Sequence, residues 1–324
     1  MSKKVFVTGA TGLLGSFITK QLLEDGYKLT CSKRRTSNMN ACTSFVDQVK
    51  WVDVDILNPI NLKEQVVGVD WVVHCAALVS FNPKDTEALD EINRIGTENI
   101  VNTCIENNIP NFFHVSSVAA FGRSKKQFEI NEDTEWEDSE LNSSYAISKY
   151  LAESEVWRGE QEGLNVIVVN PSIVLGPGDV TRSSTKLFEF TQKYKNIYPE
   201  GYTNIVDVRD VAKICVDLMR KRIFGERFII NANTVSYKEL FSEMAKHFGQ
   251  KEPSICFSKR KARIAYPFFK IIAFITQKAS FLTKQSIKMM GLKSEYDSSK
   301  IKKQLSFEYR VWKDTVRWVC NELS

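Results

Sequence analysis

Short apolar runs alternate with longer stretches of helical periodicity through the first half of the chain. Apolar runs of strand length occupy residues 4–8, 29–32, 49–54, 71–75, 112–115 and 165–169. Between most of them, apolar side chains recur at the helical spacing over residues 13–25, 60–67, 86–107 and 145–162. Strands that are apolar throughout are typical of a parallel sheet covered on both faces. The pattern therefore predicts an α/β fold with a doubly wound parallel sheet.

The rhythm changes after Pro171. A loop predicted at 176–178 precedes a helix over 187–193, a strand over 205–208 and a helix over 210–220. The remainder is mixed and mainly helical, so we expect a smaller second lobe that the chain enters more than once. The predicted division assigns 1–170 and 203–224 to the doubly wound domain, and 171–202 and 225–324 to the second lobe.

A glycine-rich turn joins the first predicted strand to the first predicted helix, and it reads Thr8-Gly9-Ala10-Thr11-Gly12-Leu13-Leu14-Gly15. Gly9 permits the tight turn, Gly12 lets a phosphate approach the backbone, and Gly15 lets the helix pack against the strand. The unpaired N–H groups of the helix N-terminus then face the phosphate. Because the pattern follows a strand and opens a helix, it predicts a dinucleotide site of the Rossmann type rather than a purely structural turn.

The end of the second strand indicates which nicotinamide cofactor is bound. An acid at this point would pair with the ribose 2′-hydroxyl of NAD, yet no Asp or Glu occurs from Gly26 through Val46. Ser32, Arg34 and Arg35 stand there instead, and a guanidinium group matches a 2′-phosphate. We therefore favour NADP(H), with Arg34 as the leading ligand. NAD(H) and a solvated basic turn remain the alternatives.

Two further strand ends carry cofactor candidates. Asp55, together with the backbone of Ile56, could hold the adenine amine, or it could form a structural turn. Ala76 and Ala77 follow the fourth strand, where a bulky side chain would block a cofactor that crosses the sheet edge. Close packing would explain these small residues too.

Tyr145 and Lys149 form the clearest catalytic pair. Their i, i+4 spacing places both side chains on one face of a helix. A free tyrosine has a pKa near ~10, and a neighbouring ammonium group is expected to lower it. Tyr145 is then a proton donor in carbonyl reduction, or an acceptor in the reverse direction, and Lys149 could also hold the nicotinamide ribose. Ser117 follows the fifth strand, where a hydroxyl can orient the substrate oxygen.

These motifs together resemble the extended short-chain dehydrogenase/reductase family, within the NAD(P)-dependent epimerase/dehydratase superfamily, over roughly residues 1–220. The matching segments are residues 8–15, 74–77, 93–99, 115–122, 145–149 and 170–178. The resemblance implies a Ser-Tyr-Lys mechanism carried by Ser117, Tyr145 and Lys149. It also implies cofactor contacts from Gly9, Thr11, Gly12, Leu13, Leu14, Asp55, Ile56, Ala76, Pro171, Ser172 and Ile173.

Two branches of that family compete for the function. A reductase must exchange its cofactor, and cells hold NADPH as the reductant, so the basic strand end favours NADP(H)-dependent reduction of an aldehyde or ketone. This branch resembles dihydroflavonol reductases and 3β-hydroxysteroid dehydrogenases. Phe121, Asn170 and Leu175 depart from residues common in nucleotide-sugar epimerases and dehydratases, which remain the alternative; a non-catalytic NADP-binding protein is the third. The candidate substrate contacts, chosen by position, are Ser80, Phe81, Phe121 and Ser172.

Basic residues concentrate in one segment of this chain of 324 residues, whose net charge is +5. Residues 259–293 contain nine Lys or Arg and no acid, so the rest of the chain is net negative. This distribution argues against general nucleic-acid binding. The apolar stretch 264–275 is too short to span a bilayer, and Pro267 is expected in the first turn of its helix. We expect that helix to cover the substrate pocket; peripheral contact with an anionic membrane is the alternative.

The cysteine and histidine content indicates which kinds of site and which cellular compartment to expect. Seven cysteines without a Cys-x-x-Cys pair argue against a disulfide framework, and only three histidines argue against a metal centre. The N-terminal sequence has no signal-peptide architecture. We therefore expect a cytoplasmic enzyme without a metal that acts on a small-molecule carbonyl or alcohol, and a homodimer is left open.

Overall fold

A seven-stranded parallel sheet dominates the computed structural model, which describes residues 3–124, 128–179, 183–276 and 282–324. The strand order is β11-β7-β5-β4-β1-β2-β3, and every neighbouring pair is parallel. The strands are β1 (Lys4–Thr8), β2 (Lys28–Lys33), β3 (Lys50–Asp53), β4 (Trp71–His74), β5 (Asn111–Val115), β7 (Asn165–Pro171) and β11 (Glu226–Ile230).

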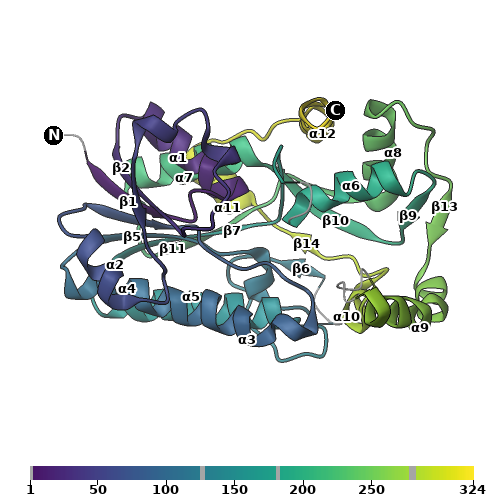
Figure 1. Ribbon diagram of the computed structural model, residues 1–324, viewed down its shortest axis with the longest axis horizontal. Helices are drawn as coiled ribbons and strands as arrows, with labels where there is room; N and C mark the ends of the chain where they lie inside the picture. Colours follow the sequence, from purple (N-terminus) through teal and green to yellow (C-terminus); the bar gives the residue numbers. More distant parts are fainter. Residues whose placement is uncertain (1–2, 125–127, 180–182, 277–281) are drawn as a thin grey trace.

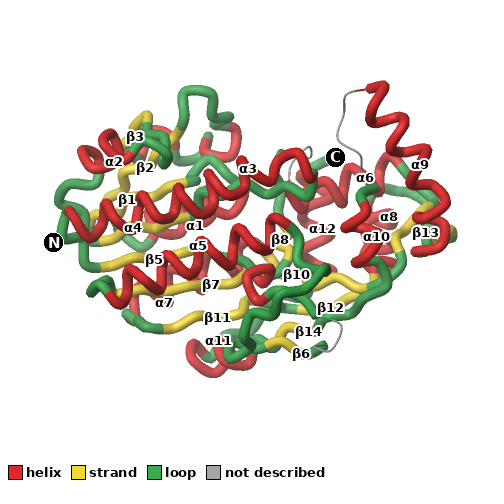
Figure 2. The backbone as a smooth tube through the Cα atoms, turned by 90° about the horizontal axis from the view of Figure 1, so that it is seen from below, coloured by secondary structure: helices red, strands yellow, loops and turns green. Residues whose placement is uncertain are grey.

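Helices cover both faces of this sheet (Figures 1 and 2). One face carries α1 (Leu13–Glu24), α7 (Val208–Lys221) and α11 (Ser299–Leu305), and the other carries α2 (Pro59–Gln65), α4 (Gly96–Glu106) and α5 (Ser144–Gln161). Each layer has its own core: Ile18 and Ile214 are fully buried in the first, and Leu62, Ile100 and Val156 in the second. The predicted α/β doubly wound class is confirmed.

The helix predicted over 86–107 is interrupted by a π-helical turn. It consists of α3 (Thr86–Leu89), the π-helix Asp90–Ile95, and α4. Asn93 in this turn binds the backbone of Leu78 through both of its amide atoms, at 2.7 and 3.0 Å. The irregular turn thereby fixes the loop that follows β4.

The second lobe contains more strand than the sequence analysis expected. A three-stranded sheet is formed by β8 (Ile173–Leu175), β10 (Tyr202–Asp207) and β12 (Asn233–Ser236), and β9 (Ile197–Pro199) pairs with β13 (Ile255–Phe257). β6 (Glu129–Ile130) pairs with β14 (Glu295–Tyr296). The helices are α6 (Lys186–Lys193), α8 (Tyr237–His247), α9 (Lys259–Thr276), α10 (Lys284–Met289) and α12 (Trp312–Glu322).

Single turns of 3-10 helix occur at Asn40–Cys42, Val46–Gln48, Pro83–Asp85, Val118–Phe121 and Ser183–Thr185.

The chain returns to the main sheet after its first passage through the second lobe. β11 pairs with β7 at the sheet edge, and α11 packs on the same layer as α7. The predicted division had placed residues 225–324 in the second lobe, so it missed this return. The boundaries of the two lobes otherwise stay a prediction.

Helix α9 differs from its expected start. It begins at Lys259, so Pro267 lies inside the helix and not in its first turn. A proline at an interior position removes one backbone hydrogen bond and crowds the preceding turn. The side chains of Ile264 and Phe268 are 73% and 66% exposed. Within the described residues, no helix combines the length and apolar character that crossing a bilayer requires.

Candidate active site

The glycine-rich turn closes tightly between β1 and α1. Gly9 has a φ of +71°, and the N–H of Gly12 donates to the Gly9 carbonyl at 3.0 Å. A Cβ on Gly15 would lie 2.1 Å from the Gly9 oxygen, whereas one on Gly12 would meet the same oxygen at 3.3 Å. Gly9 and Gly15 therefore permit the turn and the close approach of α1, as the sequence analysis inferred. Gly12 presents an exposed backbone.

The first turn of α1 offers its N–H groups without competition. Gly12 makes no side-chain cap, and the first turn holds no acidic residue. Unpaired N–H groups and the positive end of the helix dipole favour an anion at this point. Thr11, Leu13 and Leu14 are half-buried around it. A Cβ on Gly176 would lie 3.1 Å from Leu13 Cδ1, so the loop at 176–178 packs against the same turn. The turn therefore fits a pyrophosphate.

The basic end of β2 lies beside the glycine turn because β2 pairs with β1. Ser32 is buried, whereas Arg34 and Arg35 are exposed. Lys33 is paired with Asp53 at 2.5 Å, and no ion pair to Arg34 or Arg35 is found within the described part of the chain. The two guanidinium groups are therefore free to meet an anionic ligand at this corner.

The next strand end carries Asp55 and Ile56. Asp55 is exposed, and one of its carboxylate oxygens accepts the Leu57 N–H at 3.0 Å, so it forms a structural turn. The carbonyl of Ile56 accepts a hydrogen bond from Asn99 at 3.0 Å, and its side chain packs where Gly96 leaves room. Both residues lie on the cofactor edge of the sheet, but each already has a structural role there.

The two alanines after β4 differ in exposure. Ala76 lies under the glycine turn, since a Cβ on Gly9 would come within 2.5 Å of its nitrogen. This close approach involves the backbone of Ala76, so it explains the glycine at position 9. Ala77 is exposed at the sheet edge, where a small side chain leaves space above the strands.

Helix α5 brings the three predicted catalytic residues together. Ser143 caps the helix by accepting the Ala146 N–H at 3.1 Å, which fixes the first turn that carries Tyr145. Tyr145 is half-buried and close enough to Ser117 for the Ser117 side chain to lower the pKa of its phenol. Lys149 is 2% exposed, and its Nζ donates to the carbonyl of Val115 at 3.1 Å. The structure thus places Ser117, Tyr145 and Lys149 at the carboxyl end of β5.

The electrostatics of this trio differ from the expectation in one respect. Burial raises the pKa of Tyr145, and the side chain of Ser117 opposes this rise only in part. The expected lowering by Lys149 is not found, because burial dominates the pKa of the phenol and Ser117, not Lys149, is the group that lowers it. Burial also lowers the pKa of Lys149 to about 8, against the pull of Glu153. Tyr145 is therefore held protonated at neutral pH, which suits a proton donor.

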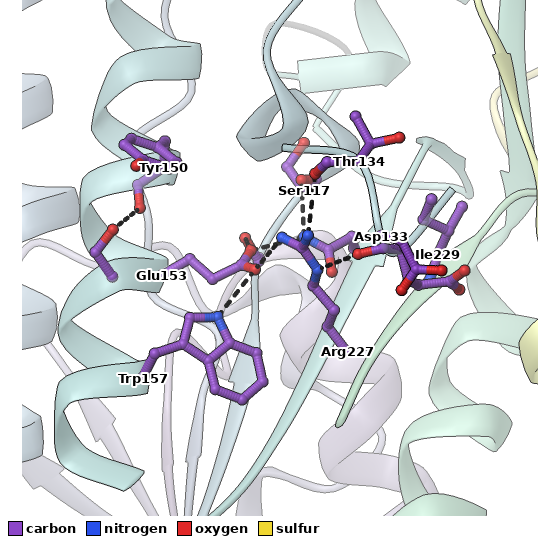
Figure 3. A network of polar contacts seen from close by, with 12 residues as sticks. Ser117, Asp133, Thr134, Tyr150, Glu153, Trp157, Arg227 and Ile229 are labelled. Carbon is purple, nitrogen blue, oxygen red and sulfur yellow. Dashed lines mark hydrogen bonds and ion pairs between the residues drawn. The ribbon is translucent and has the colours of Figure 1, made fainter. Parts of the chain in front are cut away.

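A buried carboxylate, Glu153, follows Lys149 by one turn of α5, and Figure 3 shows the polar contacts around it. Glu153 is 3% exposed, and it accepts hydrogen bonds from Ser116 at 2.6 Å and Asn170 at 2.7 Å. Trp157 and Arg227 reach its other oxygen at 3.3 and 3.4 Å. The sequence analysis did not include Glu153 or Asn170 in the site. The i, i+4 spacing of Glu153 from Lys149 was the one signal that could have indicated it.

The predicted substrate contacts have unequal positions. Phe81 is 60% exposed and lies edge-on to Tyr145, with ring centroids 5.7 Å apart. Ser80 instead donates to Asp85 at 2.5 Å within its own turn. Phe121 is 2% exposed and packs in the core beneath the guanidinium of Arg227. Phe81 is thus the candidate that faces the site.

The strand end at Pro171, Ser172 and Ile173 borders the trio through Asn170, whose amide donates to the carbonyl of Ser117 at 3.1 Å. The hydroxyl of Ser172 is buried, and no hydrogen-bond partner for it is found among the described residues. An orphaned buried hydroxyl is costly unless a ligand pairs with it. This position fits the nicotinamide end of a dinucleotide.

The first residues of α9 border a cavity of about 410 Å³. Leu141 and Ile287 line it together with charged residues of both signs, including Glu137, Lys259 and Arg263. The first residues of α9 therefore adjoin the loop that leads into α5, and the role of α9 as a cover of the substrate pocket stays a prediction.

Comparison with known proteins settles the family. The model of the NAD dependent epimerase/dehydratase family matches residues 5–231. The chain belongs to this family. A Synechocystis sp. protein that carries the name of dihydroflavonol 4-reductase is 28% identical, over 99% of this chain and 96% of its own. Vestitone reductase of Medicago sativa is 26% identical over 73% of this chain and 79% of its own.

Solved structures agree on the architecture of this epimerase/dehydratase family member. The crystal structure of gox2253 superposes with a TM-score of 0.83 at 26% identity, over 99% of this chain and 98% of that one. UDP-glucose 4-epimerase of Thermotoga maritima gives a TM-score of 0.80 at 19% identity, over 99% and 98% of the two chains, which shows the shared fold. The comparisons confirm the predicted family and the predicted NAD(P)-dependent oxidoreductase.

Proposed function

We propose that this protein is an NADP(H)-dependent reductase that converts an aldehyde or ketone into an alcohol. The observation that carries the proposal is the arrangement of Ser117, Tyr145 and Lys149 at the end of β5, with a protonated phenol facing the site. Relatives named vestitone reductase, cinnamoyl-CoA reductase and tetraketide alpha-pyrone reductase support reduction.

The residues of the chain divide the work as follows. A bound nicotinamide supplies the hydride. Ser117 orients the substrate carbonyl, and Tyr145 donates a proton to its oxygen as charge develops there. Lys149, anchored on the Val115 carbonyl, stabilises the phenolate that Tyr145 leaves behind. Lys149 is buried, so water is excluded from its ammonium group and its electrostatic effect on neighbouring groups is stronger than in water.

We propose NADP(H) over NAD(H) because Arg34 and Arg35 are exposed beside the glycine turn. The neighbouring Lys33 already forms an ion pair with Asp53. A guanidinium group binds a 2′-phosphate through several charge-assisted hydrogen bonds. An apolar substrate is favoured by Phe81, whose exposed ring lies against Tyr145.

The test measures NADPH consumption with a panel of apolar aldehydes and ketones, beside UDP-sugars as a separate arm. Consumption with a member of the carbonyl panel is expected. Turnover of a UDP-sugar without net consumption of added NADPH would instead assign an epimerase, and NADPH binding without turnover in either arm would assign a binding protein.

We propose in addition that α9 rests on an anionic lipid surface. Its exposed face combines Ile264 and Phe268 with Arg260, Lys261 and Arg263, and the segment 259–293 carries no acid. Basic side chains are attracted to anionic headgroups, and an exposed apolar face gains free energy by insertion. An apolar substrate could then reach the site from the membrane beside it.

A further inference from the structure

The carboxyl end of β5 is held at three successive residues. The carbonyl of Val115 accepts from Lys149, and the carbonyl of Ser117 accepts from Asn170, both at 3.1 Å. Between them, the hydroxyl of Ser116 donates to Glu153 at 2.6 Å. Glu153 therefore belongs to the contacts that keep Ser117 facing Tyr145.

Glu153 holds the most connected position among these contacts. It follows Lys149 by one helical turn, so it lies on the face of α5 that carries the catalytic side chains. One oxygen accepts from both Ser116 and Asn170, and Asn170 in turn holds the Ser117 carbonyl. A buried carboxylate with this many donors has a defined position, because moving it would leave several buried groups unpaired.

We propose that Glu153 is a positioning residue of the active site, which locks the end of β5 against α5 and places a negative charge behind Lys149. The inference rests on the proposed function, because it assigns Glu153 a part in the proton transfer from Tyr145.

Glu153 is the main source of negative charge acting on Lys149. Cys75, His74 and His114 also act on the ammonium group or are acted on by it. Burial raises the pKa of Cys75 to about 12 and lowers that of His74 to about 3. Burial lowers the pKa of His114 as well, so these three neighbours stay uncharged near neutral pH. Among the described groups that act on Lys149, Glu153 is thus the charged one, and it raises the pKa of Lys149.

Arg227 forms an ion pair with the carboxylate of Glu153. It approaches Glu153 at 3.4 Å from β11, and it is fixed by hydrogen bonds to the carbonyls of Glu132 at 2.8 Å and Thr134 at 3.1 Å. β11 therefore contributes to the site from the edge of the sheet, through the contact of Arg227 with Glu153 (Figure 3).

The test separates the charge of Glu153 from its hydrogen bonds. Glu153→Gln keeps the shape but removes the charge, so Lys149 should lose its proton at lower pH. We expect the titration midpoint of Lys149 to fall by about one pH unit. The midpoint is followed by NMR of the labelled ε-carbon of Lys149. The signal is assigned by its absence in Lys149→Met. The alkaline limb of the reduction rate should move down by the same amount.

Glu153→Asp keeps the charge but shortens the side chain. It should retain the wild-type midpoint of Lys149 while kcat falls, because Ser116 and Asn170 lose their shared partner. Glu155→Gln is the matched control: Glu155 lies on the same helix but pairs with Arg158 at 2.8 Å, so neither the midpoint nor kcat should change.

An unchanged Lys149 midpoint in folded Glu153→Gln would overturn the inference. If that variant does not fold, a shifted midpoint in Glu153→Asp would overturn it. The NMR readout requires no turnover, so a wild-type protein that reduces no carbonyl compound would refute the proposed function alone, while the titration would still report whether Glu153 acts on Lys149.

Discussion

Substitution by alanine should have different effects at two glycines of the same turn: it should lower stability at Gly15 and weaken cofactor binding at Gly12. In Gly15→Ala, the new Cβ would lie 2.1 Å from the carbonyl oxygen of Gly9 and 2.8 Å from its carbon. Both are backbone atoms, so no flexible side chain can move aside. In Gly12→Ala, the nearest atom is 3.3 Å away, and the backbone, at φ −86° and ψ 168°, is accessible to alanine.

The magnitudes follow from this geometry. Overpacking typically costs ~1–3 kcal/mol, and a clash with fixed backbone belongs at the upper end. Alanine in α1 recovers about 1 kcal/mol of helix propensity, so Gly15→Ala should lose about 2 kcal/mol of unfolding free energy. Gly12→Ala should change stability by less than about 1 kcal/mol, because lower unfolded-state entropy offsets a weaker cap. Its methyl group should instead obstruct the phosphate and weaken NADPH binding by about tenfold or more.

The assay compares thermal unfolding by circular dichroism with an NADPH fluorescence titration for both variants. Gly15→Ala is expected to melt at a lower temperature than wild type, and Gly12→Ala at nearly the wild-type temperature but with weaker binding. Wild-type stability in Gly15→Ala would refute the close approach of α1 to the turn. Wild-type affinity in Gly12→Ala would refute the placement of the phosphate.

Three further outcomes follow from the site and from α9. Tyr145→Phe should bind NADPH normally but reduce its substrate ~10²–10⁴-fold more slowly, since only the proton donor is lost; near-normal rates would require another donor. Arg34→Ala should weaken NADPH binding by ~10-fold or more and leave NADH binding unchanged, and equal affinities of wild type for the two cofactors would contradict the NADP(H) assignment. Wild type should sediment with anionic but not neutral vesicles at low salt, and Ile264→Ser with Phe268→Ser should reduce this. Absence of pelleting would leave α9 only its place beside the cavity.

Local spacing explains what the sequence predicted well. The turn from Gly9 to Gly15 and the pair Tyr145–Lys149 are each contained in a few residues, so helix geometry alone brings their atoms together. Ser117 was chosen by its position directly after the fifth strand, and the structure places it at the carboxyl end of β5.

Contacts between distant segments explain what the sequence missed. Glu153 takes its partners from Ser116, Asn170 and Arg227, which lie on three different strands or strand ends. The direction of the Tyr145 pKa also depends on burial, which no local spacing reveals. The position of Pro267 in the helix was predicted wrongly because α9 begins at Lys259, five residues before the apolar stretch 264–275 from which the helix was predicted.

The return of the chain to β11 limits how this enzyme can be divided. A fragment that ends at residue 170 would lack β11, α7 and α11, so β7 would expose unpaired backbone groups and one layer would lose most of its cover. The lobes are therefore not modules that a single junction could exchange. A new substrate preference has to arise by individual substitutions in the second lobe, within a chain that must still come back to complete the sheet.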